Sequence, residues 1–238
     1  MLLYYIRHGD PIYEPDQLTP LGQEQARAVA KRLARYGIDQ IYTSTSNRAI
    51  QTAQPLCDLL KKESVQLDWC NEKYAHRALS AMTEDGKKIW AVDHPEMRRF
   101  LNSPEIKQMG ENWYEHPKLA DTNFKEGILR FNRETDAFLE TLGYCRNEEQ
   151  NCYIAEKPNE QRIALFAHWG VGGAIMSHIL GIPYPQFALH FSIGHSAVSV
   201  IEFRERAGMV IPQALTYAND SHIYREGLPT KFVNRIYI

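Results

Sequence analysis

The first nine residues constrain the fold more than any other stretch of this chain. Met1 to Ile6 are all apolar or aromatic, and Arg7, His8 and Gly9 follow them directly. An apolar run of this length is typical of a short, fully buried strand. In open α/β sheets, ligands bind in the crevice at the carboxyl ends of the strands. We therefore expect this strand to deliver Arg7 and His8 side by side to a site.

These two side chains indicate a chemistry. The planar guanidinium of Arg7 suits a phosphate or a carboxylate. The imidazole of His8 can serve as a nucleophile or as a proton carrier. Because a motif of three residues also arises by chance, the interpretation depends on the residues at the ends of the other strands.

The next segment predicts a βαβ unit. Thr19 and Pro20 are typical of the first residues of a helix, and its apolar face continues to Tyr36, just before Gly37. The strand expected over 40–43 returns within a few residues. A return this short favours a parallel crossover in one sheet.

Three further strands also end at polar residues. Arg48 comes after the second strand and opens a helix expected over 48–62, where backbone N–H groups add to an anion site. Glu72 comes after a strand expected over 65–69. His168 comes after a strand expected over 162–167. With Arg7 and His8, five side chains that could bind an anion or transfer a proton thus lie directly after predicted strands of one sheet. Chance easily places one such residue there, but much less easily five.

The remaining segments are less regular. The stretch 75–125 is too long for a structureless loop, so we expect an insertion packed over the sheet end like a lid. Periodicity and composition predict a helix over 127–142 and a second helix that follows the segment 168–173 and ends at Leu180. They also predict a polar surface excursion over 144–161, strands over 197–203 and 209–216, a turn at 219–222 and a terminal edge strand over 232–238.

The chain of 238 residues therefore predicts one α/β domain, 1–238, with three α/β/α layers around a mostly parallel sheet. The formal net charge of −2 does not favour a nucleic-acid or membrane partner. The four cysteines lack metal-type spacing and read as reduced thiols of a cytoplasmic protein. No apolar run approaches the ~20 residues of a membrane span. No cofactor or metal is expected, and a homo-oligomer is compatible with the sequence.

Several motifs together resemble the histidine phosphatase superfamily, in its phosphoglycerate mutase-like branch. The matching residues are Arg7-His8-Gly9, Leu18-Thr19-Pro20-Leu21-Gly22 with Gln25-Ala26, Thr43-Ser44 with Arg48-Ala49 and Thr52-Ala53, Glu72, Glu126 and Arg133, and Ala167-His168. The resemblance covers residues 1–72 and 125–203.

The resemblance implies a role for each site residue. His8 would be the nucleophile that forms a phosphohistidine, while Arg7, Arg48 and His168 would hold the three non-bridging oxygens. Glu72 would protonate the leaving oxygen and then deprotonate the attacking water, which requires a raised pKa. Such enzymes need neither metal nor cofactor.

The sequence departs from the family pattern at two places that bear on the substrate, Trp169 and the segment 71–77. Trp169 stands where the family usually has Gly, so its indole either lines the leaving-group pocket or packs in the core. Tyr13 is a second candidate for substrate contact. The segment 71–77 matches the mutase pattern only in part, although Lys73 and Arg77 could hold a second phosphate.

The function expected is a metal-independent phosphomonoesterase with a phosphohistidine intermediate and a small phosphorylated substrate. Alternatives are mutase-like phosphoryl transfer and a non-catalytic phospho-ligand binding protein.

Two other motifs are incomplete. The glycines at 170, 172 and 173 resemble a dinucleotide fingerprint whose third small residue is missing at Ile175. The segment 194–198 resembles a serine nucleophile elbow without its closing Gly.

Overall fold

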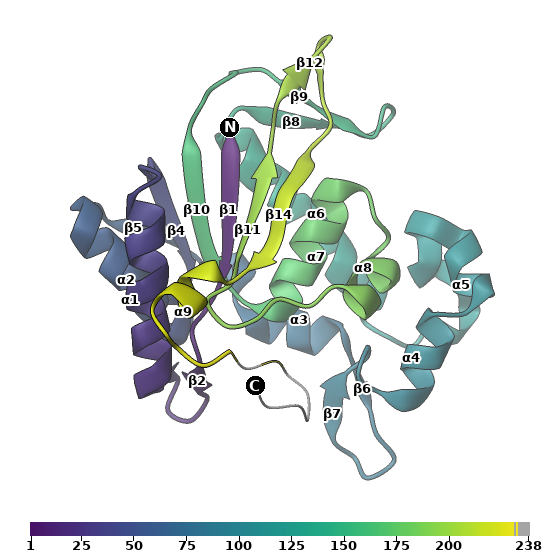
Figure 1. Cartoon of the computed structure of the whole chain (residues 1–238). Coiled ribbons are helices and arrows are strands. Elements are labelled where there is room, and N and C mark those ends of the chain that lie inside the picture. The colour runs from purple at the N-terminus through teal and green to yellow at the C-terminus, as the bar shows by residue number, and fades with distance from the viewer. Residues whose placement is uncertain (231, 233–238) are drawn as a thin grey trace.

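The computed structural model describes residues 1–230 and 232. A six-stranded sheet in the order β14-β11-β1-β10-β4-β5 forms its centre (Figure 1). Its strands are β1 (Leu2–Arg7), β4 (Gln40–Ser44), β5 (Ser64–Leu67), β10 (Arg162–Ala167), β11 (Val198–Glu202) and β14 (Gln213–Asn219). The strands β1, β10, β4 and β5 pair in parallel, and β11 pairs antiparallel to both β1 and β14. The expected mostly parallel α/β architecture is confirmed.

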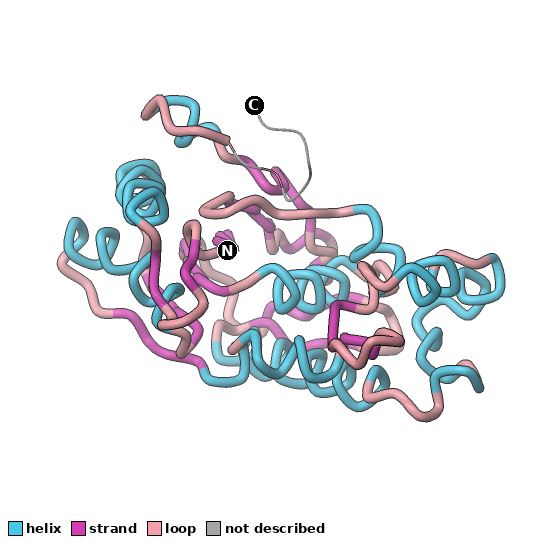
Figure 2. The backbone as a smooth tube through the Cα atoms, turned by 90° about the horizontal axis from the view of Figure 1, so that it is seen from below, coloured by secondary structure: helices cyan, strands magenta, loops and turns pink. Residues whose placement is uncertain are grey.

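Helices cover both faces of this sheet (Figure 2). The four long ones are α1 (Pro20–Ala34), α2 (Asn47–Leu60), α6 (Phe124–Thr141) and α7 (Trp169–Leu180). Tyr4 and Ile6 of β1 share a core cluster with residues of α1 and α2. Leu3 and Tyr5 belong to a second cluster with residues of α6 and α7. This split arises from the strand geometry, because successive side chains point to opposite faces.

The predicted start of α1 is present in detail. The Thr19 side chain accepts a hydrogen bond from the backbone N–H of Gly22 at 3.0 Å, and Pro20 is the first helical residue. The helix ends at Ala34, and Gly37 forms the subsequent turn with φ of 72°. The loop expected before the helix contains a small hairpin of β2 (Pro11–Ile12) and β3 (Gln17–Leu18).

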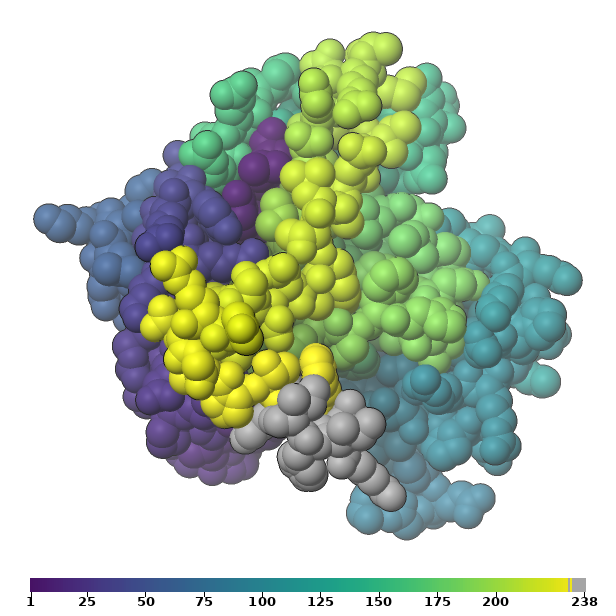
Figure 3. Space-filling model, viewed as in Figure 1, coloured from purple at the N-terminus to yellow at the C-terminus, as the bar shows by residue number. Residues whose placement is uncertain are grey.

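The insertion lies at the carboxyl end of β1, at the lower right of Figures 1 and 3. A short helix η1 (Asp68–Cys70) leads into it from β5. Its elements are α3 (Glu72–Ala78), β6 (Ser80–Met82), β7 (Lys88–Trp90), α4 (Pro95–Leu101), α5 (Pro104–Met109), η2 (Gly110–Glu115) and η3 (Pro117–Leu119). Trp113 is fully buried here and contacts the rings of Phe124 and Tyr184. The insertion thus packs on α6 and on α8 (Tyr184–His190), a helix that the sequence reasoning missed.

The prediction of a polar surface excursion over 144–161 is wrong. This segment forms β8 (Tyr144–Asn147) and β9 (Cys152–Ala155) of a second sheet, ordered β12-β13-β9-β8. The partner strands β12 (Glu205–Arg206) and β13 (Met209–Val210) lie far along the chain. Tyr144 and Tyr153 are fully buried, and both rings contact that of Phe203, a residue distant in sequence.

Three predicted elements lie near the C-terminus. The strand predicted over 209–216 is two strands, β13 and β14, in different sheets. The turn predicted at 219–222 is wrong: α9 (Ser221–Arg225) begins within it and buries His222. The edge strand predicted over 232–238 lies outside the described residues, except for Phe232, which is in no strand. Within the described part of the chain, no helix is long and apolar enough to cross a membrane.

Candidate active site

The carboxyl ends of β1, β4 and β10 bring four predicted residues together. Arg7 is the last residue of β1, and His8 comes directly after it. Arg48 lies in the first turn of α2, and His168 links β10 to α7. All four side chains are buried, and the ring centroids of His8 and His168 lie 5.2 Å apart.

A hydrogen bond holds the His8 ring in a single tautomer. Its Nδ1 lies 2.7 Å from the carbonyl oxygen of Gly9. A carbonyl only accepts, so Nδ1 carries the proton and Nε2 keeps its lone pair. Burial lowers the pKa of His8 well below its usual value, and the neighbouring His168 and arginines lower it further. His8 therefore has the neutral imidazole that a nucleophile requires.

Two arginines supply positive charge beside this ring. Arg7 donates from Nη1 to the Ile193 carbonyl at 2.7 Å, and Arg48 donates from Nη1 to Asp16 at 2.8 Å. The Nε–H groups of both arginines are buried without a hydrogen-bond partner among the described residues. A buried unpaired donor costs about 1–3 kcal/mol. An anion bound here would give both groups an acceptor.

The second histidine is part of a hydrogen-bonded chain. Arg48 Nη2 donates to His168 Nδ1 at 3.2 Å, and His168 Nε2 lies 2.8 Å from Ser44 Oγ. Because a guanidinium only donates, the neutral His168 carries its proton on Nε2 and donates it to Ser44. Burial, first of all, lowers the pKa of His168 well below its usual value. These two hydrogen bonds therefore fix the orientation of Arg48 and His168 relative to each other.

Glu72 meets the start of helix α7. Its Oε1 accepts from the Gly170 N–H at 3.0 Å, and its Oε2 accepts from the Val171 N–H at 3.2 Å. Glu72 is the first residue of α3, and η1 separates it from β5, so it does not lie directly after the strand. Burial raises the pKa of Glu72 and outweighs the two N–H groups, which lower it. A raised pKa is what a proton donor needs near neutral pH.

Tyr13 and Trp169 both line the same cavity, whose volume is about 1360 Å³. Tyr13 is 61% exposed, and its ring centroid lies 5.4 Å from Arg48 Cζ. Trp169 is half-buried and also packs against the core, so both roles considered for it have a geometric basis. The insertion supplies one wall of the cavity through His76, Trp90, Val92, Asp93 and Arg98.

One site residue was missed in the sequence reasoning. His195 lies with its ring centroid 5.5 Å from that of His8 and its Nδ1 3.4 Å from Asp10 Oδ1. It precedes β11, which runs antiparallel to β1. The amino end of an antiparallel strand meets the carboxyl ends of its neighbours. Asking which residues precede such a strand would have found His195.

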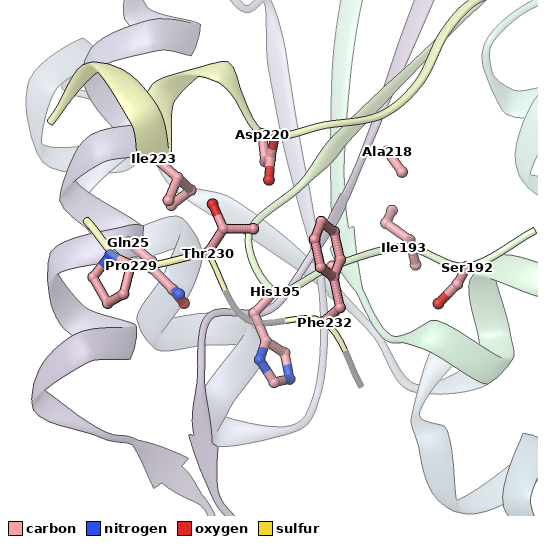
Figure 4. A pocket seen from close by; sticks show the side chains of 11 residues that line it. Gln25, Ser192, Ile193, His195, Ala218, Asp220, Ile223, Pro229, Thr230 and Phe232 are labelled. Carbon is pink, nitrogen blue, oxygen red and sulfur yellow. The ribbon is translucent and has the colours of Figure 1, made fainter. Parts of the chain in front are cut away.

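A smaller pocket adjoins the cavity and shares Ser192 and His195 with it. Figure 4 shows Gln25, Asp220 and Thr230 around this pocket, with His195 at its lower edge. The two hollows thus adjoin at Ser192 and His195. Among the described residues, no group of three or more His, Cys, Asp or Glu side chains is placed to hold a metal ion.

In the incomplete nucleophile elbow, the hydrogen bond between Ser196 and His222 runs in the direction that does not activate the serine. Ser196 is fully buried, and its Oγ lies 2.9 Å from His222 Nε2. Arg32 Nη1 lies 3.4 Å from His222 Nδ1 and can only donate to it. Burial, together with Arg32, lowers the pKa of His222 to about 4. The neutral ring therefore donates to Ser196 and does not act as its base.

The glycines of the incomplete dinucleotide fingerprint have a packing role. A Cβ at Gly170 would lie 2.7 Å from Cζ3 of Trp90, and one at Gly172 would lie 2.7 Å from Cε1 of Tyr5. Both positions therefore let an aromatic ring approach the backbone of α7. Their spacing is explained by this contact rather than by a nucleotide.

A comparison with known families identifies the superfamily to which this chain belongs. The profile of the histidine phosphatase superfamily (branch 1) matches residues 3–126. The chain belongs to this superfamily. The resemblance seen in the motifs is confirmed, and the expected enzyme class, a phosphoric monoester hydrolase of the histidine phosphatase type, is confirmed with it.

Similar proteins carry several phosphatase names. A protein of Hydrogenobacter thermophilus named "Putative phosphoserine phosphatase 2" is 26% identical over 76% of this chain and 79% of its own length. A phosphoserine phosphatase variant from Entamoeba histolytica, solved with phosphoserine, has a TM-score of 0.57 at 18% identity, covering 93% of this chain and 98% of that one. The alpha-ribazole phosphatase of Shigella flexneri has a TM-score of 0.56 at 20% identity, covering 92% and 97%. These two structures share the fold.

Proposed function

We propose that this histidine phosphatase hydrolyses a small phosphomonoester without a metal ion, through a phosphohistidine on His8. The observation that carries the proposal is the His8 ring, whose Nδ1 proton goes to Gly9 and whose Nε2 keeps its lone pair. Nε2 attacks phosphorus, and the bond from phosphorus to the leaving oxygen breaks. Water then attacks the phosphohistidine, and the electron pair of the N–P bond returns to Nε2.

Arg7, Arg48 and His168 hold the three non-bridging oxygens in this proposal. Phosphoryl transfer depends mainly on positioning and on stabilising charge spread over these oxygens. The two Nε–H groups, which have no partner among the described residues, and the buried setting support the arginines in this role. His168 takes part when a phosphate oxygen replaces Ser44 as the acceptor of its Nε2–H.

Glu72 is the proton carrier of the proposed cycle. In the first step its carboxyl proton goes to the leaving oxygen, and in the second step the carboxylate takes a proton from the attacking water. The raised pKa supports the first half, and the two N–H groups of α7 support the carboxylate in the second half. Each cycle restores both Glu72 and His8.

The positions of Lys73 and Arg77 favour hydrolysis over mutase-like transfer. A mutase would need both cations to hold a second phosphate beside His8. Lys73 lines the cavity with His8, but its Nζ pairs with Asp68 Oδ1 at 3.3 Å. Arg77 lines a different hollow of the insertion, away from His8. We propose a small phosphorylated substrate, in line with the phosphatases named above, and contacts from Tyr13 and Trp169 to its leaving group.

The test compares hydrolysis of an aryl phosphate by the wild type and by His8→Ala, each with excess chelator. We expect wild-type turnover that survives the chelator and is lost in His8→Ala, with an unchanged circular dichroism spectrum. Turnover by His8→Ala would contradict the nucleophile, and loss on chelation would contradict metal independence. If neither protein turns over, phosphosugar exchange would indicate a mutase, and phosphate-ester binding alone would indicate a non-catalytic protein.

A further inference from the structure

The cavity has an aromatic wall on the side of the insertion. The ring centroids of His76 and Trp90 lie 5.2 Å apart at 88°, and those of Trp90 and Trp169 lie 5.3 Å apart at 76°. The three rings come from α3, β7 and α7, and all three line the cavity. Each residue is half-buried, so a ring face or edge remains open to a ligand. We call these three residues the aromatic wall.

The wall is fixed beside the proposed proton donor. Trp90 packs directly on the backbone of Gly170, where a Cβ would overlap the indole. The N–H of the same residue, Gly170, donates to Glu72. A leaving oxygen placed to receive the Glu72 proton therefore sets the rest of the leaving group against Trp90 and Trp169.

Three charged residues on this side, Lys73, Asp93 and Arg98, also line the cavity, but all three are exposed to solvent. Lys73 pairs with Asp68, and its side chain is 59% exposed. Arg98 is exposed and donates one N–H to the Val92 carbonyl at 2.8 Å. Asp93 is exposed as well. Solvent screens such exposed charges, so they contribute little to holding an ionic leaving group.

The third ring of the wall is uncharged near neutral pH. Burial lowers the pKa of His76, and the nearby Lys88 lowers it further. A neutral imidazole packed edge-to-face on an indole presents an aromatic surface rather than a cation. The wall is thus aromatic along its whole length.

We propose that the aromatic wall binds an aromatic ring in the leaving group, so that the preferred substrates are phosphomonoesters of ring-bearing alcohols. This inference rests on the proposed function and names its substrate class. It differs from the amino-acid phosphate named for the Hydrogenobacter and Entamoeba proteins. Aromatic stacking with an indole supplies the selectivity.

The test uses two esters whose alkoxides are of similar basicity, 2-phenylethyl phosphate and n-butyl phosphate, with phosphoserine as a third substrate. For the wild type, we expect kcat/KM for the phenylethyl ester to exceed both others about tenfold. Trp169→Leu should bring the ratio of phenylethyl to butyl ester close to one, and Trp169→Phe should restore most of it. Tyr224→Leu, which changes an aromatic residue 89% exposed on α9, should leave both rates unchanged.

Inhibition by the matched phosphonates, which are not hydrolysed, tests the wall in the wild type without any substitution. We expect the phenylethyl phosphonate to bind about tenfold more tightly than the butyl one. Equal rates and equal binding, a ratio that survives Trp169→Leu, or a preference for phosphoserine would overturn the inference. Failure of the proposed function looks different: no His8-dependent hydrolysis of any ester, whatever the phosphonates do.

Discussion

The Nδ1 atom of His8 lies 2.7 Å from the carbonyl oxygen of Gly9, its neighbour in the chain. This contact places the ring proton away from the cavity and leaves Nε2 as the ring nitrogen with a lone pair. Gly9 reaches this position because α1 packs closely on it: a Cβ there would lie 2.6 Å from the Gly22 carbonyl oxygen. The nucleophile is therefore oriented by backbone geometry.

The pH profile should show how strongly burial acts on His8. Protonation of Nε2 removes the nucleophile, and burial lowers the pKa of His8 well below its usual value near 6.5. With an aryl phosphate, after correction for substrate ionisation, kcat/KM should hold its plateau at about pH 6 and fall only at lower pH. A half-maximal value at about pH 6.5 or above would show that the ring titrates like a free imidazole.

Glu72→Gln should separate substrates by the basicity of their leaving groups. An alkyl phosphate needs a proton on its leaving oxygen, so we expect its kcat/KM, which reports the phosphorylation step, to drop by about 10²–10⁴. An activated aryl phosphate should lose far less. Glu111→Gln is the matched control, because burial also raises the pKa of Glu111 but this residue does not line the cavity. Equal slowing of both substrates by Glu72→Gln would move the acid role elsewhere.

Arg48→Ala should reduce kcat by about 10²–10³, the usual effect of removing one charge-stabilising donor. Asp16→Asn should give a smaller loss, because Asp16 positions the Arg48 guanidinium through its contact at 2.8 Å. Arg35→Ala, at the exposed end of α1, is the control and should keep full activity. Steady-state kinetics on one aryl phosphate measures all three. Full activity of Arg48→Ala would be incompatible with the proposed anion site.

Trp90→Leu should change the titration of Glu72. The Trp90 ring covers the start of α7 at Gly170, whose N–H holds the Glu72 carboxylate. Water reaching Glu72 would lower its raised pKa toward the usual value. Because the acid form is needed for alkyl phosphates, the alkaline limb of kcat should move to lower pH. An unshifted limb, with the fold intact by circular dichroism, would show that Trp90 does not shield this carboxyl.

Much of the site could be predicted from the sequence because its residues lie just past the ends of strands. Arg7 and His168 lie at the ends of buried apolar strands, and Arg48 lies in the first turn of the helix that follows β4. That pattern depends on local sequence alone. Glu72 was also found, although η1 separates it from its strand.

The parts that sequence reasoning missed depend on contacts distant in the chain. His195 reaches His8 only because β11 runs antiparallel to β1. The rings of Tyr144 and Tyr153 both pack against Phe203, which comes much later in the chain. Trp90 belongs to an insertion without clear periodicity, so nothing local places it on Gly170.

The central claim is that phosphate passes through His8. The most direct measurement is to quench the enzyme in the steady state with labelled substrate and locate the label by mass spectrometry under alkaline conditions. We predict an acid-labile, alkali-stable phosphoryl group on the peptide that contains His8, absent from His8→Ala and accumulating in Glu72→Gln with an aryl phosphate. Turnover without any labelled enzyme, or with the label on another residue, would contradict this claim.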